Sequence, residues 1–129
     1  MFTIEQIQQA HAQVKSGADF PAYIRDLKTL GVTGYETWVA DGHTNYFGAN
    51  AYSVISKGKY DALTISGQSD KAGFQTRLKS HQDGQTDYMT FCRDCAATGI
   101  EKWIVDLARM TCTYYDRNEQ EILTEAIPG

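Results

Sequence analysis

Hydrophobic and polar positions along this chain of 129 residues alternate between a helical period and a strand period. Thr3 and Gln6 form a capping-box pattern ahead of a first apolar stripe, which predicts an amphipathic helix that ends near residues 16–17. Asp19 is suited to cap a second helix, and Gly31 is suited to end it. The two stripes predict a tight helix pair, and they consist of Ile4, Ile7, His11 and Val14, then Phe20, Tyr23, Ile24, Leu27 and Leu30.

From Thr33 the period changes to two, as expected for strands that bury one face. Asp41 and Gly42 predict a two-residue hairpin turn, with further strand around residues 52–55 and 62–65. The hairpin places one set of side chains toward the core: Tyr35, Thr37, Val39, Thr44 and Tyr46. The opposite set is less cleanly polar, and it consists of Glu36, Trp38, Ala40, His43, Asn45 and Phe47.

The order of elements then begins again, because residues 18–32 align with residues 86–100 at a constant offset of 68. The expected helix caps and helix ends align at this offset, and the alignment continues into the strands. A helix over about residues 70–82 precedes the second block, and residues 121–127 supply a third strand. The chain therefore carries the same succession of elements twice.

These patterns predict an α+β fold in a single domain over residues 1–129. We expect two pseudo-repeated helix-helix-strand-strand-strand halves, about 1–66 and 67–129, with antiparallel sheet. Neither half covers its own sheet face, so the two sheets are expected to join or to face each other under the helices. Chance similarity between two amphipathic helices is the alternative, because few aligned residues are identical.

Composition and charge narrow the class of function. The content of 42% hydrophobic and 22% charged residues is that of an ordinary globular domain, which excludes a disordered or fibrous chain. The net charge is −4 and no run of Lys or Arg occurs, so we expect no nucleic-acid binding. No stretch of 18 apolar residues and no signal-peptide pattern is present, which predicts no membrane association and a cytoplasmic location.

Cys92 and Cys95 stand in the C-x-x-C spacing of redox motifs and zinc sites. At the offset of 68 they align with Ile24 and Leu27 of an apolar stripe, and Cys92 lies past the first turn of its helix, where the helix dipole is weak. The remaining cysteine and the three scattered histidines do not complete a zinc site. We predict that both thiols pack in the core, with a redox or metal role as the alternative.

The strand face that carries His43 is the more promising place for function. Trp38, Asp41, His43, Asn45 and Phe47 are the predicted ligand-binding residues, because an Asp-x-His arrangement beside aromatic rings could hold a ligand or shuttle protons. An ordinary hairpin with a solvated histidine is the alternative. The aromatic residues on this face are either exposed for a partner or covered by other elements, and coverage is the commoner case for strand aromatics.

His11 and His81 both lie on apolar helical stripes. A lone histidine in such a place is more often a core or boundary residue with satisfied hydrogen bonds than a catalyst. We therefore expect neither to be catalytic.

Three stretches resemble a family of uncharacterised bacterial proteins of similar length, some of which are labelled phage envelope or prophage-encoded proteins. They are FTIEQIQQAHAQVKSGADFP at residues 2–21, YETWVADGHTNYFGAN at residues 35–50 and CTYYD at residues 112–116. The resemblance implies a small bacterial or prophage-encoded domain. It implies no activity and no catalytic residues.

The function expected from these observations is that of a non-enzymatic binding or regulatory module. Its partner would be a protein or a small ligand at the His43 face, and no cofactor, metal or catalytic residue is assigned. A small enzyme is the alternative, with acid-base chemistry by His43 and Asp41 or thiol chemistry by Cys92 and Cys95. A homodimer formed through an exposed strand edge is a third reading.

Overall fold

The computed structural model describes residues 2–14 and 19–127. Within them, each half of the chain has two helices followed by three strands. The first half contains α1 (Ile4–His11), α2 (Phe20–Leu30), β1 (Val32–Trp38), β2 (Thr44–Gly48), the short 3-10 helix η2 (Ala49–Ala51) and β3 (Ser53–Ser56). The second contains α3 (Lys71–Gln82), α4 (Tyr88–Ala97), β4 (Lys102–Asp106), β5 (Thr111–Tyr115) and β6 (Glu121–Ala126).

The strands form one antiparallel sheet in the order β3-β2-β1-β4-β5-β6, with β3 and β6 at its two edges. The predicted α+β fold is therefore confirmed, and the two sheets join edge to edge. β1 and β4 make the junction, where Tyr35 lies opposite Val105 and Thr37 lies opposite Trp103.

The hairpins of the two halves share one register. Tyr35 pairs with Tyr46 in the first hairpin, and Trp103 pairs with Tyr114 in the second, each residue 68 positions after its counterpart. Such a junction relates the central strands by an approximate two-fold axis perpendicular to the sheet, which keeps equivalent side chains on the same face. That the sequence itself arose by duplication stays a prediction.

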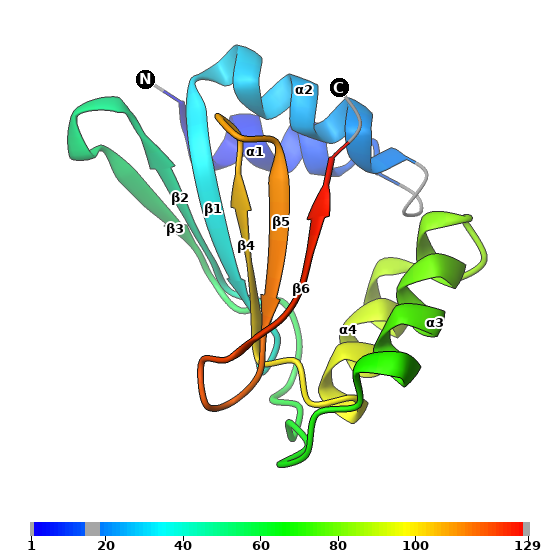
Figure 1. The fold of residues 1–129 in the computed structure, drawn as a ribbon. Coiled ribbons are helices and arrows are strands. Elements are labelled where there is room, and N and C mark those ends of the chain that lie inside the picture. Colours follow the sequence, from blue (N-terminus) through cyan, green and yellow to red (C-terminus); the bar gives the residue numbers. More distant parts are fainter. Residues whose placement is uncertain (1, 15–18, 128–129) are drawn as a thin grey trace.

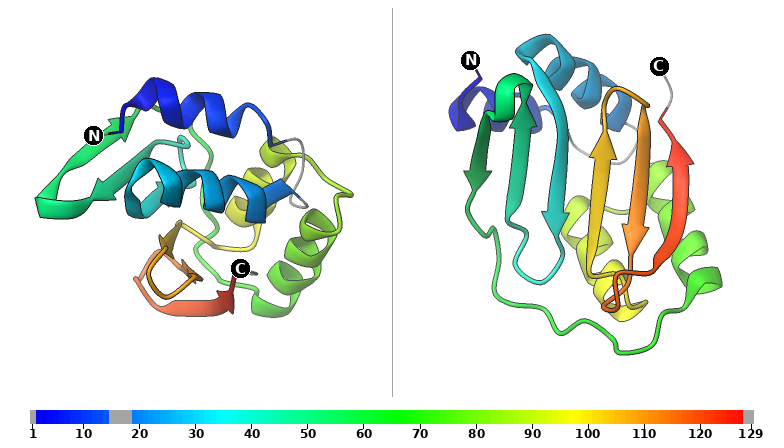
Figure 2. Two further views of the ribbon diagram at one scale, coloured as in Figure 1. Left: turned by 90° about the horizontal axis from the view of Figure 1, so that it is seen from above. Right: turned by 60° about the vertical axis from the view of Figure 1, so that its left-hand side comes forward.

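Both helix pairs lie on one side of the sheet (Figure 1), and the sheet curves around them when seen from above (Figure 2). We call this covered side the inner face. The side chains predicted to face the core are buried on it, with exposures of 4% or less for Tyr35, Thr37, Val39, Thr44 and Tyr46. No described helix covers the outer face. The expectation that other elements cover the aromatic residues there is wrong for Phe47, which is 41% exposed, whereas Trp38 and Tyr115 are half-buried. The two-fold junction is the reason, because it places both helix pairs on the same side.

Two local predictions are corrected. The connection between β1 and β2 spans residues 39–43 instead of a two-residue turn: the Trp38 N–H donates to the His43 carbonyl at 3.0 Å and the Gly42 N–H to the Trp38 carbonyl at 2.8 Å. Val39 is buried in the core, and its N–H donates to the Glu101 carbonyl at 2.8 Å. Residues 62–65 form no strand; they belong to the segment between β3 and α3, where Leu63 donates to the Ala40 carbonyl at 2.7 Å.

Most of the predicted helix signals are used as expected, but Asp19, which stands at the N-cap position of α2, makes no side-chain capping hydrogen bond. Thr3 forms the capping box of α1, Asp87 caps α4 by accepting from the Thr90 N–H at 2.8 Å, and Gly31 ends α2 with a left-handed φ of 100°. α1 ends at His11, earlier than predicted, and the predicted end at residues 16–17 lies outside the described residues. Over residues 2–14 and 19–127, no helix is long and apolar enough to cross a membrane.

Candidate functional site

A cavity of about 110 Å³ lies between the inner face of the sheet and the two helix pairs. The strands contribute nine residues to its wall: Tyr35, Thr37, Thr44, Tyr46, Trp103, Cys112, Tyr114, Glu125 and Ala126. The helices contribute mainly rings: His11, Phe20, Tyr23, His81, Tyr88 and Phe91. Aromatic side chains from both halves therefore meet around one space, which we call the central cavity.

The wall of the central cavity is built from matched positions of the two halves. Seven pairs of lining residues stand 68 positions apart: Val14 and Gln82, Phe20 and Tyr88, Tyr23 and Phe91, Tyr35 and Trp103, Thr44 and Cys112, Tyr46 and Tyr114, and Lys59 and Ile127. The shared register of the hairpins explains this correspondence, because it carries equivalent side chains to equivalent places on the inner face. The cavity thus lies at the junction of the two halves.

The rings of the wall support one another. Trp103 lies 5.5 Å from Phe91, 6.2 Å from Tyr114 and 6.3 Å from Tyr88, measured between ring centroids. Tyr35 lies 5.5 Å from Tyr46 in the first half. These separations are typical of favourable aromatic pairs, so the wall is a packed layer and not a loose collection of side chains.

The hydroxyl groups of the wall are neutral at physiological pH. The Tyr23 and Tyr46 hydroxyls lie 3.4 Å apart and the Thr37 and Thr44 hydroxyls 3.0 Å apart. Burial raises the pKa of Tyr23 and Tyr46, so both stay protonated. The interior therefore offers aromatic faces and a few uncharged hydroxyls to an occupant.

Both helical histidines line the central cavity. His11 contacts the rings of Tyr23 at 5.3 Å and Tyr88 at 5.4 Å, and burial, followed by the positive charge of Lys59, lowers its pKa to about 4. His81 stacks on Phe91 at 4.4 Å, with its Nδ1 3.1 Å from the Thr86 carbonyl oxygen. Burial lowers the pKa of His81 as well. Both imidazoles are thus neutral wall residues near pH 7.

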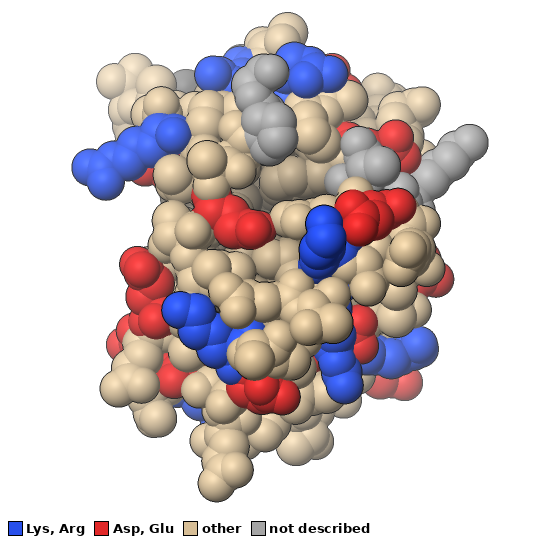
Figure 3. All heavy atoms as spheres, turned by 45° about the vertical axis from the view of Figure 1, so that its right-hand side comes forward, with Lys and Arg blue, Asp and Glu red and all other residues tan. Residues whose placement is uncertain are grey.

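Charged groups among the described lining residues are confined to Lys59 and Glu125. The Lys59 Nζ lies 5.6 Å from the centre of the Tyr88 ring, and partial burial lowers the pKa of this ammonium, although the residue as a whole is exposed. A Glu125 carboxylate oxygen accepts a hydrogen bond from the Gln82 amide at 2.8 Å. Figure 3 shows positive and negative side chains interspersed on this side of the molecule, without a large patch of one sign.

The residues predicted as a ligand site lie on the outer face. Here Asp41, His43 and Trp38 do come together: the His43 Nδ1 lies 2.6 Å from the Asp41 Oδ1, and the His43 ring stacks on Trp38 at 6.0 Å. Partial burial raises the pKa of Asp41, but hydrogen bonds from His43 outweigh this effect and lower the pKa below its ordinary value. Asn45 belongs to the same group only through Glu36, which accepts from both Asn45 at 3.4 Å and Trp38 at 2.8 Å.

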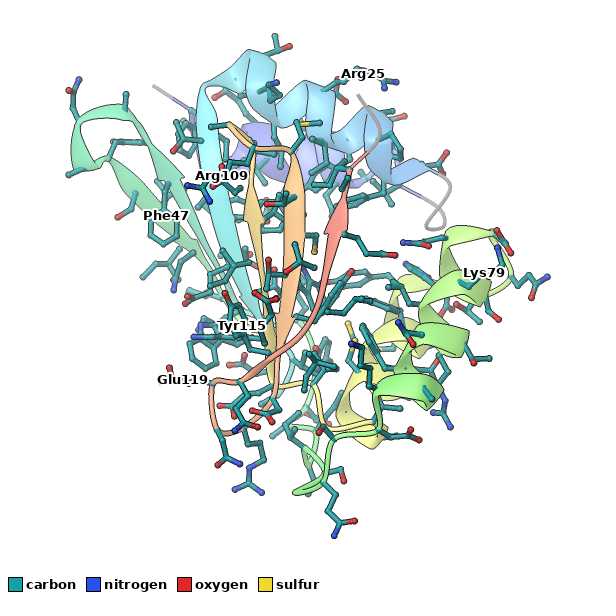
Figure 4. All side chains as sticks on the ribbon, viewed as in Figure 1. Arg25, Phe47, Lys79, Arg109, Tyr115 and Glu119 are labelled. Atoms are coloured by element: carbon teal, nitrogen blue, oxygen red, sulfur yellow. The ribbon has the colours of Figure 1, made fainter. Side chains whose placement is uncertain are left out.

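Phe47 lies farther along β2 and is 41% exposed. Figure 4 shows Phe47 and Tyr115 projecting from the outer side of the sheet, away from the helices. A polar hollow of about 290 Å³ beside Trp38 is lined by Glu101, Lys102 and residues 116–119, and it includes none of the other four predicted residues. Ligand binding by this outer group stays a prediction.

The three cysteines are free and buried, which confirms the predicted core packing of Cys92 and Cys95. Burial raises the pKa of both thiols, and it raises the pKa of Cys112 to about 12. A raised pKa disfavours the thiolate that redox chemistry and metal binding require. Among residues 2–14 and 19–127, no three His, Cys, Asp or Glu residues lie together in a way that could hold a metal ion.

The central cavity was not predicted, although its wall residues were. The inward faces of Tyr35, Thr37, Thr44 and Tyr46 follow from strand period, and the offset of 68 assigns Trp103, Cys112 and Tyr114 to equivalent places. A periodic pattern shows which side chains point inward, but it does not show whether they meet or leave a space. The signal that could have been used is the surplus of Tyr and His on stripes that otherwise carry aliphatic residues.

Comparison with known proteins gives relatives without an assigned activity. The uncharacterized proteins Rv2012 and MT2067 of Mycobacterium tuberculosis and Mb2035 of Mycobacterium bovis are each 26% identical to this chain over 103 residues. The match covers 78% of this chain and 62% of each relative, so the chain spans less than two thirds of the length of these curated proteins.

A family model described as a protein of unknown function, DUF1398, matches residues 8–126. The resemblance to uncharacterised bacterial proteins is thereby confirmed, while the prophage or phage envelope label stays a prediction. Because the match covers nearly the whole chain, the protein belongs to the DUF1398 family of unknown function.

Proposed function

We propose that this protein is a non-enzymatic binding module that holds a small, flat, largely apolar molecule in the central cavity. The observation that carries the proposal is the aromatic wall, to which both halves contribute matched rings. A concave, mostly apolar site with a few convergent polar groups is the usual form of a small-molecule site. The proposed class of function, a non-enzymatic binding module, is the one expected from the sequence. The proposed binding site, however, lies on the inner face instead of the outer face.

The size of the cavity suits a single ring. Its volume of about 110 Å³ compares with roughly 150 Å³ for an engineered apolar cavity that binds benzene. Ordinary ligand pockets are larger, about 300–1,000 Å³. A ligand would therefore place one ring inside and extend its remaining atoms toward the mouth.

Water is the competing occupant, since about four molecules would fill this volume at roughly 30 Å³ each. The wall disfavours them, because the described side-chain polar atoms that are buried already have hydrogen-bond partners. Water without such partners is held weakly. An apolar ring that displaces it should gain free energy.

The chemistry of the wall favours binding over catalysis. His11, with a pKa of about 4, is a weak base at neutral pH, and the Cys112 thiol is protonated. The outer Asp41 and His43 pair is the remaining acid-base candidate, and its 2.6 Å contact favours it as a second place for function. Acid-base chemistry by this pair stays a prediction. The same holds for a protein partner, for a homodimer through a sheet edge, and for a cytoplasmic or prophage setting.

The two tryptophans test the location directly, because Trp103 lines the central cavity and Trp38 lies on the outer face. We would titrate the labelled protein with p-cresol, a neutral single-ring probe, and follow both indole N–H signals by NMR. A saturable shift of the Trp103 signal, with the Trp38 signal unchanged, is the expected result. A shift of Trp38 only, or of neither signal, would contradict the proposal.

Neighbouring residues of β5 provide a matched pair of variants. Cys112→Met adds volume inside the central cavity, whereas Thr113→Met adds the same side chain on the outer face. The first variant should abolish the Trp103 response, and the second should preserve it. Unchanged binding by the Cys112→Met protein would place the probe elsewhere.

A further inference from the structure

We infer that the central cavity selects aromatic ligands with a carboxylate or similar anionic group, and that Lys59 binds this group. The inference rests on the proposed function and adds the chemical class of the ligand. It depends on the position of Lys59, on the lack of an acidic partner for it, and on the contrast with Glu125 at the same cavity.

The Lys59 backbone is fixed against the end of the first hairpin. Its N–H donates to the Asp41 carbonyl at 2.7 Å, and the hydroxyl of the next residue, Tyr60, donates to the Val39 carbonyl at 2.6 Å. The side chain runs from this anchor to the cavity wall, where its ammonium lies over Tyr88. A cation held in this way needs little ordering when a ligand binds.

The Lys59 ammonium forms no ion pair within the described residues. Its surroundings are the Tyr88 ring and the neutral His11, whose lowered pKa reports the nearby positive charge. A partly desolvated cation without a counter-ion gains most from an arriving anion, because a charge-assisted hydrogen bond then replaces lost hydration. The structure thus leaves one charge for the ligand to neutralise.

Glu125 is the described lining residue that could instead attract a cation. Its carboxylate already accepts from the Gln82 amide at 2.8 Å, and it belongs to the edge strand β6, opposite Cys112. A cationic ligand would have to compete with that hydrogen bond and with Lys59. The two charges therefore favour an anion.

The aromatic ring of the ligand would lie beside Tyr88 and Trp103. Tyr88 joins the two parts of the site, since its ring lies under the Lys59 ammonium and 6.3 Å from the ring of Trp103. A carboxylate one or two bonds from a single ring can reach Lys59 while the ring contacts Tyr88 and Trp103. Phenylacetate has these proportions.

The test compares three probes of similar size at neutral pH: phenylacetate, phenylacetamide and phenethylammonium. Affinity is measured from the Trp103 indole N–H shift. We expect phenylacetate to bind about tenfold more tightly than the amide, as one charge-assisted hydrogen bond allows. We expect the ammonium compound to bind most weakly.

The variant Lys59→Gln should reduce the affinity for phenylacetate to that for phenylacetamide and leave the amide affinity unchanged, which also shows that the fold is intact. Lys59→Arg should keep the preference. Lys57→Gln is the matched control, because Lys57 is an exposed lysine outside the lining of the cavity. This control should bind all three probes as the wild type does.

The outcomes separate the two proposals. If no probe shifts the Trp103 signal, the binding function fails and the anion preference fails with it. If the amide binds as tightly as phenylacetate, if the ammonium compound binds best, or if Lys59→Gln keeps the preference, the anion inference is overturned while the binding function stands.

Discussion

The inner and outer faces of the sheet carry aromatic residues on the same strands but use them differently. On the inner face, Tyr35 and Trp103 are 4% and 5% exposed and contact other rings around the central cavity. On the outer face, Trp38 contacts charged groups: it donates to Glu36 at 2.8 Å and lies 4.8 Å below the Lys102 ammonium. The difference shows that an aromatic strand residue can belong to a binding wall or to a solvated polar cluster, depending on which side the helices cover.

The two faces also differ in the charge of their side chains. Burial keeps the inner groups uncharged, because desolvation disfavours the imidazolium of His11 and the thiolate of Cys112. The outer face carries ion pairs instead, since the Lys102 ammonium lies 4.0 Å from a Glu36 carboxylate oxygen and 3.6 Å from a Glu119 carboxylate oxygen. Substitutions of the same type on the inner and outer faces should therefore change the stability or the reactivity of the protein by different amounts.

Truncation of the two tryptophans should give the largest difference. Trp103→Ala removes a buried ring that contacts Phe91, Tyr88 and Tyr114, and it should lower the free energy of unfolding by about 3–5 kcal/mol. Trp38→Ala removes a half-buried ring, one hydrogen bond and one cation–π contact, and it should cost about 1 kcal/mol. Urea unfolding measures both. Equal losses would mean that the inner wall is not the packed layer described above.

Thiol labelling should show the next largest difference. Cys112 faces the cavity and its pKa is raised to about 12 by burial, whereas a cysteine introduced by Thr113→Cys would lie on the outer face of the same strand. Because the thiolate is the reactive form, native Cys112 should react at least about a hundredfold more slowly than the introduced thiol. Mass spectrometry of labelled peptides resolves the two sites. Rapid labelling of Cys92, Cys95 or Cys112 in the folded protein would refute their burial.

The pH dependence of stability should report the burial of His11 on the inner face. The pKa of His11 is about 4 in the folded protein and 6.5 in the unfolded chain, so the unfolded chain binds the proton first as the pH falls. Stability should therefore drop between pH 6.5 and pH 4, by about 2 kcal/mol once partial exposure is allowed for. The contribution of His11 is the difference in the free energy of unfolding between the wild type and the His11→Gln protein, measured by urea unfolding at several pH values.

Asn45→Gln is the matched control on the outer face, because it removes no titratable group, and it should keep the slope of the wild type over this pH range. A His11→Gln protein with an unchanged slope would show that His11 is not desolvated by the wall.

Substitution of an outer aliphatic residue should have the smallest effect. Ile55 is 66% exposed on the edge strand β3, so Ile55→Thr should change the free energy of unfolding by less than about 0.5 kcal/mol. Val105→Thr, which buries a hydroxyl at a position that is 1% exposed, should cost about 2 kcal/mol. A large loss from Ile55→Thr would reveal that β3 is covered in solution, and sedimentation would then test for a dimer.

Most of the fold could be predicted from the sequence, because its signals are local. The capping box at Thr3, the helix end at Gly31 and the inward faces of Tyr35 and Tyr46 all follow from the geometry of one helix or one strand pair. The candidate site was less predictable. The His43 group was recognised because its members are close in sequence, whereas the central cavity joins residues such as Tyr23, Lys59 and Trp103, which are far apart in the chain.

By itself, the sequence determined the elements, the inward and outward side of each strand residue, and the burial of Cys92 and Cys95, since each depends on a period of a few residues. Only the tertiary structure decided that both helix pairs cover the same side of one sheet, that the rings there leave a space, and that Lys59 of a connecting segment reaches Tyr88 of α4. The reason is that these relations depend on how β1 meets β4 and how far the helices stand from the sheet, and those distances are set by packing between distant segments and not by any local pattern.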